Sequence, residues 1–123
     1  MNDTEFVNSL KKEIMDDLYS RYFSTLNTPP IEGGNKSWND SKELYSQLNE
    51  KQQKELKTFV RLVMTDTLSN VFAKLDNLSS FAEQGGFFEL TLNGKTISGD
   101  LQEIFLMQIE EENNKAHNNH LNC

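Results

Sequence analysis

The chain has 123 residues, of which 36% are hydrophobic and 25% are charged, and its formal net charge is −7. This composition is typical of a soluble globular protein and excludes an intrinsically disordered chain. Every apolar run falls short of the roughly 20 residues that cross a bilayer, so we expect no membrane partner.

The first residues and the cysteine content indicate a compartment. The opening MNDTEFVNSL is acidic, whereas a secretory signal begins with a basic and then an apolar region. Cys123 is the only cysteine and has no partner for an internal disulfide. We therefore expect a cytoplasmic protein.

The acidic charge is concentrated in the last third of the chain. Residues 78–123 carry seven acidic and two basic side chains, whereas residues 40–77 carry six of each. Such a segment repels phosphate backbones, which excludes nucleic acid as a partner, and it favours a basic protein. The alternative that these carboxylates only keep the surface solvated stays open.

Three helices are predicted in the first two thirds of the chain. Apolar residues at helical spacing predict a helix over about 3–27, which Asp3 or Thr4 would cap. Pro29 and Pro30 end it. A short helix, SKELYSQL, then begins at Asp40 or Ser41, and a capping box of Asn49 and Gln52 opens the longest helix, over about 50–77.

The longest helix is apolar on more than half of its circumference, which predicts that it lies in the middle of the core. We expect buried side chains on this helix and, packed against them, buried residues from the other segments. The expected core residues are Phe59, Val63, Val71, Phe72 and Leu75, with Leu10, Leu18, Leu90, Ile97 and Phe105.

A β-hairpin is predicted over about residues 86–98. Asn93-Gly94 favours a two-residue type I′ turn, which pairs Leu92 with Lys95 and Thr91 with Thr96. The same register gathers apolar side chains on one face, so that face should pack on helices. This apolar face consists of Phe88, Leu90, Leu92 and Ile97. A last helix, capped by Ser98 or Asp100, then follows.

The predicted fold is therefore α+β and mainly α, with about four helices and one C-terminal two-stranded antiparallel hairpin packed on them. Residues 1–113 form a single domain in this prediction. Residues 114–123, which are rich in asparagine, form a flexible tail.

Candidate sites for chemistry are few. Asp66 lies among apolar residues of the longest helix, so it is predicted to be a buried carboxylate that serves recognition or catalysis, or that instead caps a neighbouring loop or pairs with Arg21 or Arg61. His117, His120 and Cys123 recur every three residues, so one helical turn could gather them as metal ligands, but they lie in the predicted tail. We expect no catalytic residues, no metal site and no cofactor.

The stretch RLVMTDTLSNVFAKLD, followed by a hairpin and LQEIFL, resembles a group of small bacterial proteins of unassigned function, some of them similar to immunity proteins encoded beside toxins. The resemblance covers about residues 56–106. It rests on Arg61, Asp66, Thr67, Leu75, Asp76, Leu101 and Phe105. It implies a protein that binds another protein.

These observations favour a non-enzymatic protein-binding domain, of which an immunity-type inhibitor of a toxin is one form. The candidate partner-binding residues are Glu89, Glu103, Glu110 and Glu111, which would meet a basic protein. One alternative is a homo-oligomer, such as a homodimer, with a structural or regulatory role. The other is a small enzyme centred on Asp66.

Overall fold

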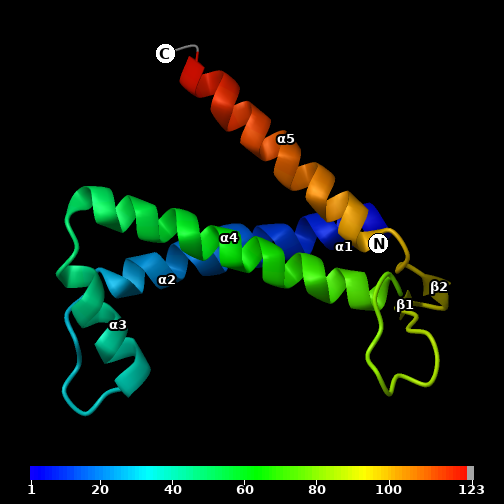
Figure 1. Ribbon diagram of the computed structural model, residues 1–123, viewed down its shortest axis with the longest axis horizontal. Helices are drawn as coiled ribbons and strands as arrows, with labels where there is room; N and C mark the ends of the chain where they lie inside the picture. Colours follow the sequence, from blue (N-terminus) through cyan, green and yellow to red (C-terminus); the bar gives the residue numbers. More distant parts are fainter. Residues whose placement is uncertain (122–123) are drawn as a thin grey trace. The chain divides into compact units, whose positions relative to one another are not determined.

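The structure, a computed structural model, describes residues 1–121, with side chains described through Ala116. His117, His120 and Cys123, the residues of the possible metal motif, therefore lie outside the described side chains. The elements are α1 (Asp3–Leu10), the π-helix η1 (Lys11–Leu18), α2 (Tyr19–Leu26), α3 (Lys36–Ser46), α4 (Glu50–Leu75), β1 (Thr91–Leu92), β2 (Lys95–Thr96) and α5 (Leu101–Leu121) (Figure 1).

The predicted fold class is confirmed. The first three helical elements follow one another without a break, so the described chain has four helical segments and one two-stranded antiparallel sheet. The middle of the first segment is π-helical, and an ion pair joins Lys12 and Asp17 across five positions at 3.0 Å. That spacing fits the i→i+5 repeat of a π-helix, which apolar periodicity does not predict.

The chain packs as two compact units. The terminal unit comprises residues 1–11 and the chain from Asp66 onward, and the central unit comprises residues 12–65. The sequence prediction treats residues 1–113 as a single domain. It also places a flexible tail from residue 114, which stays a prediction; helix α5 extends to Leu121.

The core of the terminal unit joins α1, the end of α4, the hairpin and α5. Val7, Leu101 and Phe105 are fully buried, and the ring of Phe72 meets that of Phe105 edge-on with centroids 5.5 Å apart. Helix α1 packs against α5. A capping box of Asn2 and Glu5 begins α1, so the prediction of Asp3 or Thr4 as the cap is wrong.

The core of the central unit joins η1, α2 and α3. Met15, Phe23 and Tyr45 are buried, and the rings of Phe23 and Tyr45 lie 6.0 Å apart. Asn49 and Gln52 form the predicted capping box, with bonds of 3.0 and 2.9 Å.

Helix α3 begins earlier than predicted. Asn35 caps it by accepting the backbone N–H of Trp38 at 2.9 Å, so Asp40 and Ser41 lie inside the helix. The side chain of Asn39 closes the preceding turn by bonding to both backbone groups of Ile31. Because of this cap, α3 begins before the positions at which the sequence predicted the short helix to start.

The predicted core is only partly correct. Phe72, Ile97 and Phe105 are buried, but Phe59, Val63 and Val71 are 61%, 46% and 50% exposed. The remaining predicted residues are half-buried: Leu10, Leu18, Leu75 and Leu90.

The exposed residues follow from the way each half of α4 is buried. In the central unit Val60 and Met64 are half-buried, whereas in the terminal unit the buried residues are Ser69, Phe72 and Ala73. Each half is therefore buried on one side only, and the apolar residues on its other sides stay in solvent.

Candidate functional site

The hairpin has the predicted turn and register. Thr91 pairs with Thr96 and Leu92 with Lys95, and both turn residues have positive φ, 52° at Asn93 and 78° at Gly94. Positive φ at both positions is the requirement of a type I′ turn, which glycine meets without strain. The strands are short, and one further backbone bond of 2.8 Å joins Ile97 to Leu90.

Only the base of the hairpin is buried. Ile97 is 7% exposed, whereas Leu92 and Phe88, on the same predicted apolar face, are 42% and 40% exposed. Glu89 is exposed and accepts a hydrogen bond from the hydroxyl of Thr96. The hairpin therefore contributes one side chain to the core and offers most of its surface to solvent.

A buried carboxylate lies at the end of α4, where the sequence did not predict one. Asp76 is 8% exposed, and its two oxygens accept the backbone N–H groups of Gly99 at 2.6 Å and Gln102 at 2.8 Å. Gln102 in turn donates to the hydroxyl of Ser69 at 3.1 Å. Because these N–H groups lie at the start of α5, Asp76 caps that helix and complements its dipole.

Of the two residues predicted to cap α5, Asp100 holds the cap position, because its backbone carbonyl accepts the N–H of Ile104 at 3.0 Å, but the side-chain acceptor is Asp76. The hydroxyl of Ser98 accepts the N–H of Leu90 at 3.0 Å and so belongs to the hairpin. An acceptor more than 20 positions away in the sequence supplies the cap. Spacing along the sequence does not show such a partner, although Asp76 is one of the residues that carry the resemblance described above.

The opposite sides of α5 have different surroundings. Leu101 and Phe105 are buried, and Glu112, on the same side, forms an ion pair with Lys11 at 3.6 Å. The other side, which we call the outward face of α5, is exposed. It consists of Glu103, Leu106, Met107, Glu110 and Glu111.

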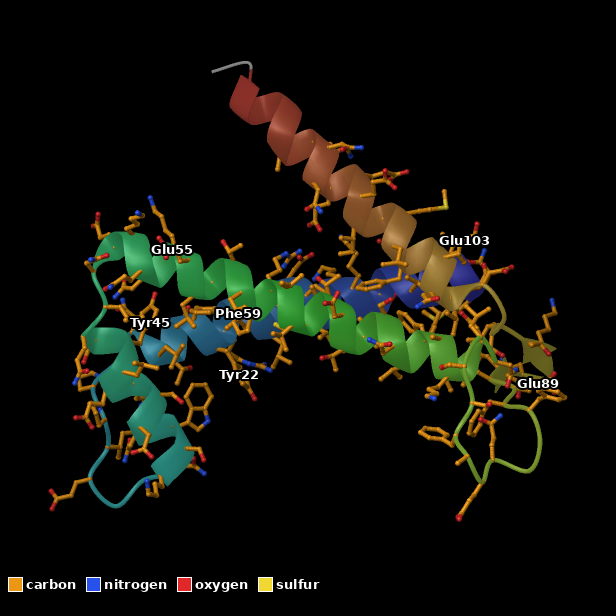
Figure 2. The ribbon with its side chains drawn as sticks, in the orientation of Figure 1. Tyr22, Tyr45, Glu55, Phe59, Glu89 and Glu103 are labelled. Atoms are coloured by element: carbon orange, nitrogen blue, oxygen red, sulfur yellow. The ribbon has the colours of Figure 1, made fainter. Side chains whose placement is uncertain are left out.

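The outward face of α5 contains three of the four predicted partner-binding glutamates. Glu103, Glu110 and Glu111 lie within about two and a half turns of one helix, and Leu106 and Met107, at 44% and 55% exposure, lie between them. Glu89 lies on the hairpin, apart from Glu103 at the start of α5 (Figure 2). The structure thus gathers three predicted residues and leaves the fourth on another element.

Asp66 is exposed, so the prediction of a buried carboxylate is wrong. It shares one side of α4 with Phe59 and Val63, and that side faces solvent, so its apolar neighbours in the sequence do not remove it from water. Arg61, one of the two predicted partners, lies 3.6 Å from Asp16 in the central unit. The enzyme alternative depended on the burial of Asp66 and loses that support.

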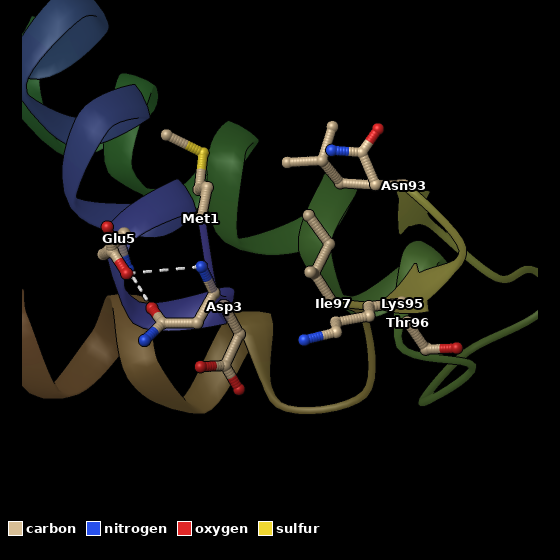
Figure 3. A pocket seen from close by; sticks show the side chains of 9 residues that line it. Met1, Asp3, Glu5, Asn93, Lys95, Thr96 and Ile97 are labelled. Carbon is tan, nitrogen blue, oxygen red and sulfur yellow. Dashed lines mark hydrogen bonds between the residues drawn. The ribbon is translucent and has the colours of Figure 1, made fainter.

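Each unit also contains a hollow. In the terminal unit, a cavity of about 520 Å³ lies between the start of α1 and the hairpin, and residues of both line it (Figure 3). Two carboxylates line this cavity: Glu5 is engaged in the cap of α1, and Asp3 accepts the backbone N–H of Thr4 at 2.6 Å. In the central unit, a cavity of about 390 Å³ is lined by Tyr22, Phe23, Leu26, Trp38 and Val60, with three polar residues at its edge.

Two further findings bear on the predicted chemistry. Among the described side chains, no three His, Cys, Asp or Glu residues gather where they could hold a metal ion. Within the same part of the chain, no helix combines the length and the apolar character needed to cross a membrane.

Comparison of the chain with known protein families, with curated proteins and with solved structures finds no match. The resemblance of residues 56–106 to small bacterial proteins therefore stays a prediction.

Proposed function

We propose that this protein acts without catalysis, by binding a basic protein on the outward face of α5. The observation that carries the proposal is the arrangement of that face, where two exposed apolar side chains lie between exposed glutamates on one helix. The side of α5 that α1 covers contains no such pattern, because its glutamate is paired with Lys11.

The two kinds of side chain have different tasks in this interface. Leu106 and Met107 supply apolar area whose removal from water stabilises the complex, by about 25 cal/mol for each Å² buried. Glu103, Glu110 and Glu111 attract a positively charged surface and set its orientation. A methionine adapts its shape to a partner more easily than a branched side chain does.

An immunity-type inhibitor is one specific form of this proposal, and the resemblance described above is its support. The binding of an acidic helix to a basic enzyme would block that enzyme without any reactive group on the inhibitor. A toxin-like gene beside the gene for this protein would supply the candidate partner.

The test begins with isolation of bound proteins from cells of the source organism and production of the identified partner. Association rates are then measured at several salt concentrations for the wild type and for Glu103→Lys/Glu110→Lys. We expect the double variant to associate at least about tenfold more slowly, and the wild-type rate to fall as salt rises, because charges are screened within about 8 Å at physiological ionic strength.

A matched control distinguishes the effect of charges on the outward face of α5 from the effect of the net charge of the protein. Glu43→Lys/Glu50→Lys makes the same change in net charge at two exposed positions of the central unit. If both double variants slow association equally, net charge alone steers the partner and the proposed face is wrong. Circular dichroism checks that α5 remains folded, because Glu103 lies in its first turn.

One observation favours a second candidate, a homo-oligomer. In the central unit, Phe59, Leu62 and Val63 form an exposed apolar strip on α4 that a second copy can cover. Sedimentation velocity of the wild type and of Phe59→Ser tests it. A wild-type dimer that becomes a monomer on this substitution would support this candidate.

A further inference from the structure

The segment that joins α4 to the hairpin, residues 77–88, is an ordered loop with exposed aromatic side chains; we call it the aromatic loop. Its two ends are held together by Asn77, whose side chain donates to the carbonyl of Phe88 at 2.9 Å and accepts the N–H of Phe88 at 2.8 Å. Asn77 has a positive φ of 61°, a conformation that asparagine tolerates better than most residues. A loop whose ends meet in this way is an Ω-loop, a type that is often functional.

The interior of the aromatic loop is also held by hydrogen bonds. The side chain of Gln84 accepts the N–H of Phe81 at 3.1 Å and donates to the carbonyl of Gly86. The backbone N–H of Gln84 also donates to the carbonyl of Phe81, at 3.2 Å. The loop therefore has a defined shape before any partner binds.

This shape presents apolar side chains to solvent. Phe87 is 90% exposed, the most exposed large apolar residue of the described chain, and Leu78 and Phe81 are 64% and 56% exposed. The ring of Phe81 is held by Lys74, whose ammonium lies 4.4 Å from its centroid, and by a T-shaped contact with the ring of Phe88, with centroids 6.3 Å apart. These contacts fix the base of the patch, and Phe87 projects from it.

We propose that the aromatic loop is a docking element that inserts Phe87 into an apolar pocket of a protein partner, with basic residues around that pocket. A preorganised aromatic side chain loses little conformational entropy on binding, which is why aromatic residues dominate the energetics of many interfaces. The inference goes beyond the proposed function, because it concerns a separate surface and would stand if the outward face of α5 had no partner.

The charges on the aromatic loop favour a different protein as its partner over a membrane or a second copy of this chain. From residue 77 to residue 90 the chain has two acidic residues, Glu83 and Glu89, and no basic one, and Lys74 beside the loop is engaged over Phe81. An anionic membrane surface would repel these carboxylates. In a symmetric contact with a second copy, each acidic patch would face its own equivalent. A basic rim on a different protein complements both carboxylates.

The test uses the full-length protein with Phe87 replaced by the photoreactive p-benzoylphenylalanine, irradiated in cells of the source organism. The cross-linked protein is identified by mass spectrometry, produced separately, and the position of the cross-link on it is mapped. Dissociation constants are then measured for wild type, Phe87→Ser, Val71→Ser and Glu83→Lys. Val71 is a matched control, because it is 50% exposed on α4 in the same unit.

We expect the cross-link to map to an apolar pocket with Lys or Arg at its rim. Phe87→Ser should weaken binding about thirtyfold or more, as is typical for a central aromatic anchor, and Val71→Ser should have little effect. Glu83→Lys should weaken binding more at low salt than at high salt. Glu103→Lys/Glu110→Lys, measured in parallel, shows separately whether the outward face of α5 takes part.

Three results would overturn the inference. The first is the absence of any cross-linked protein that binds the wild type better than Phe87→Ser. The second is sedimentation of the wild type, but not of Phe87→Ser, with phosphatidylcholine vesicles, which would assign the loop to a lipid surface. The third is self-association that Phe87→Ser abolishes, which would assign it to a second copy. Because Phe87 is almost fully exposed, its substitution should leave the fold intact.

Discussion

The middle and the end of α4 each carry an aspartate, and the two have opposite surroundings. Both follow mostly apolar residues, Leu62–Met64 for Asp66 and Phe72–Leu75 for Asp76, yet Asp66 is exposed, whereas Asp76 is buried against the start of α5. The difference teaches that apolar neighbours in the sequence do not bury a helical residue. The residue is buried only where another element covers its side of the helix.

The same comparison applies to the aromatic residues of α4, where we expect the largest effect. Phe72→Ala should lower the free energy of unfolding by about 3–5 kcal/mol, because it leaves a cavity beside Phe105 in a closely packed core. Phe59→Ala removes the same side chain from a position that is 61% exposed and should cost less than about 1 kcal/mol. Urea denaturation of both variants measures the difference, and equal losses would break the comparison.

For the two aspartates we expect a smaller effect. Asp76→Ala removes the acceptor of two backbone N–H groups at the start of α5 and should cost about 3 kcal/mol, since each hydrogen bond to a charged group contributes at least about 1.5 kcal/mol. Asp66→Ala should change the stability by less than about 0.5 kcal/mol. Asp76→Asn retains one acceptor and should lie between these values. A large effect at Asp66 would show that its exposed position in the structure is wrong.

The hairpin allows the surroundings of Asp76 to be perturbed from a distance. Gly94→Val should cost at least about 1 kcal/mol, because a β-branched residue resists the positive φ of the turn. Gly86→Ala is the control, since its φ is not in the positive range and no atom lies within 4 Å of an added Cβ. Gly99, which donates to Asp76, follows the second strand. Gly94→Val and Asp76→Ala should therefore combine non-additively in thermal unfolding.

We expect the smallest effect at two tyrosines of the central unit, of which Tyr19 is half-buried and Tyr22 is exposed. Burial raises the pKa of the Tyr19 phenol, while the charge of nearby Arg61 acts in the opposite direction, and the hydroxyl donates to the carbonyl of Lys57. A raised pKa means that the folded state holds the proton more tightly. Its stabilising contribution is therefore complete below the unfolded value near 10 and is lost as the pH rises through the folded pKa.

Titration of the phenolate absorbance should accordingly show one tyrosine that ionises later than an unfolded tyrosine. Tyr19→Phe should remove this late component, and it should also reduce the loss of stability at alkaline pH. Tyr22→Phe, at a position that is 50% exposed, should leave the late component in place. If Tyr19→Phe instead removed a tyrosine that ionises like an unfolded one and left the late component in place, the burial of Tyr19 would be wrong.

Much of the local structure was predictable because its causes lie close together in the chain. The turn at Asn93-Gly94 and the pairing of Thr91 with Thr96 follow from the φ angles that these residues accept and from the alternation around them. The capping box of Asn49 and Gln52 spans three positions of the same turn. In each case the partners of a hydrogen bond lie within one short segment.

The glutamates of the outward face of α5 were predicted as charges, but their arrangement was not. Their place on one exposed side depends on which side α1 covers, and the exposure of Leu106 and Met107 between them depends on the same contact. No site was predicted in the aromatic loop. The side chain of Asn77, which closes it, bonds to a residue 11 positions away.

By itself, then, the sequence determined the mainly helical class, the hairpin and its register, and the acidic charge of the last third of the chain. These properties depend on backbone preferences and composition, which act within a few residues. Only the tertiary structure decided that Phe59 and Val63 are exposed, that Asp66 is in solvent and that Asp76 caps α5. The reason is that burial is a property of a pair of surfaces. A helix with apolar residues on most sides does not specify which side its neighbours will cover.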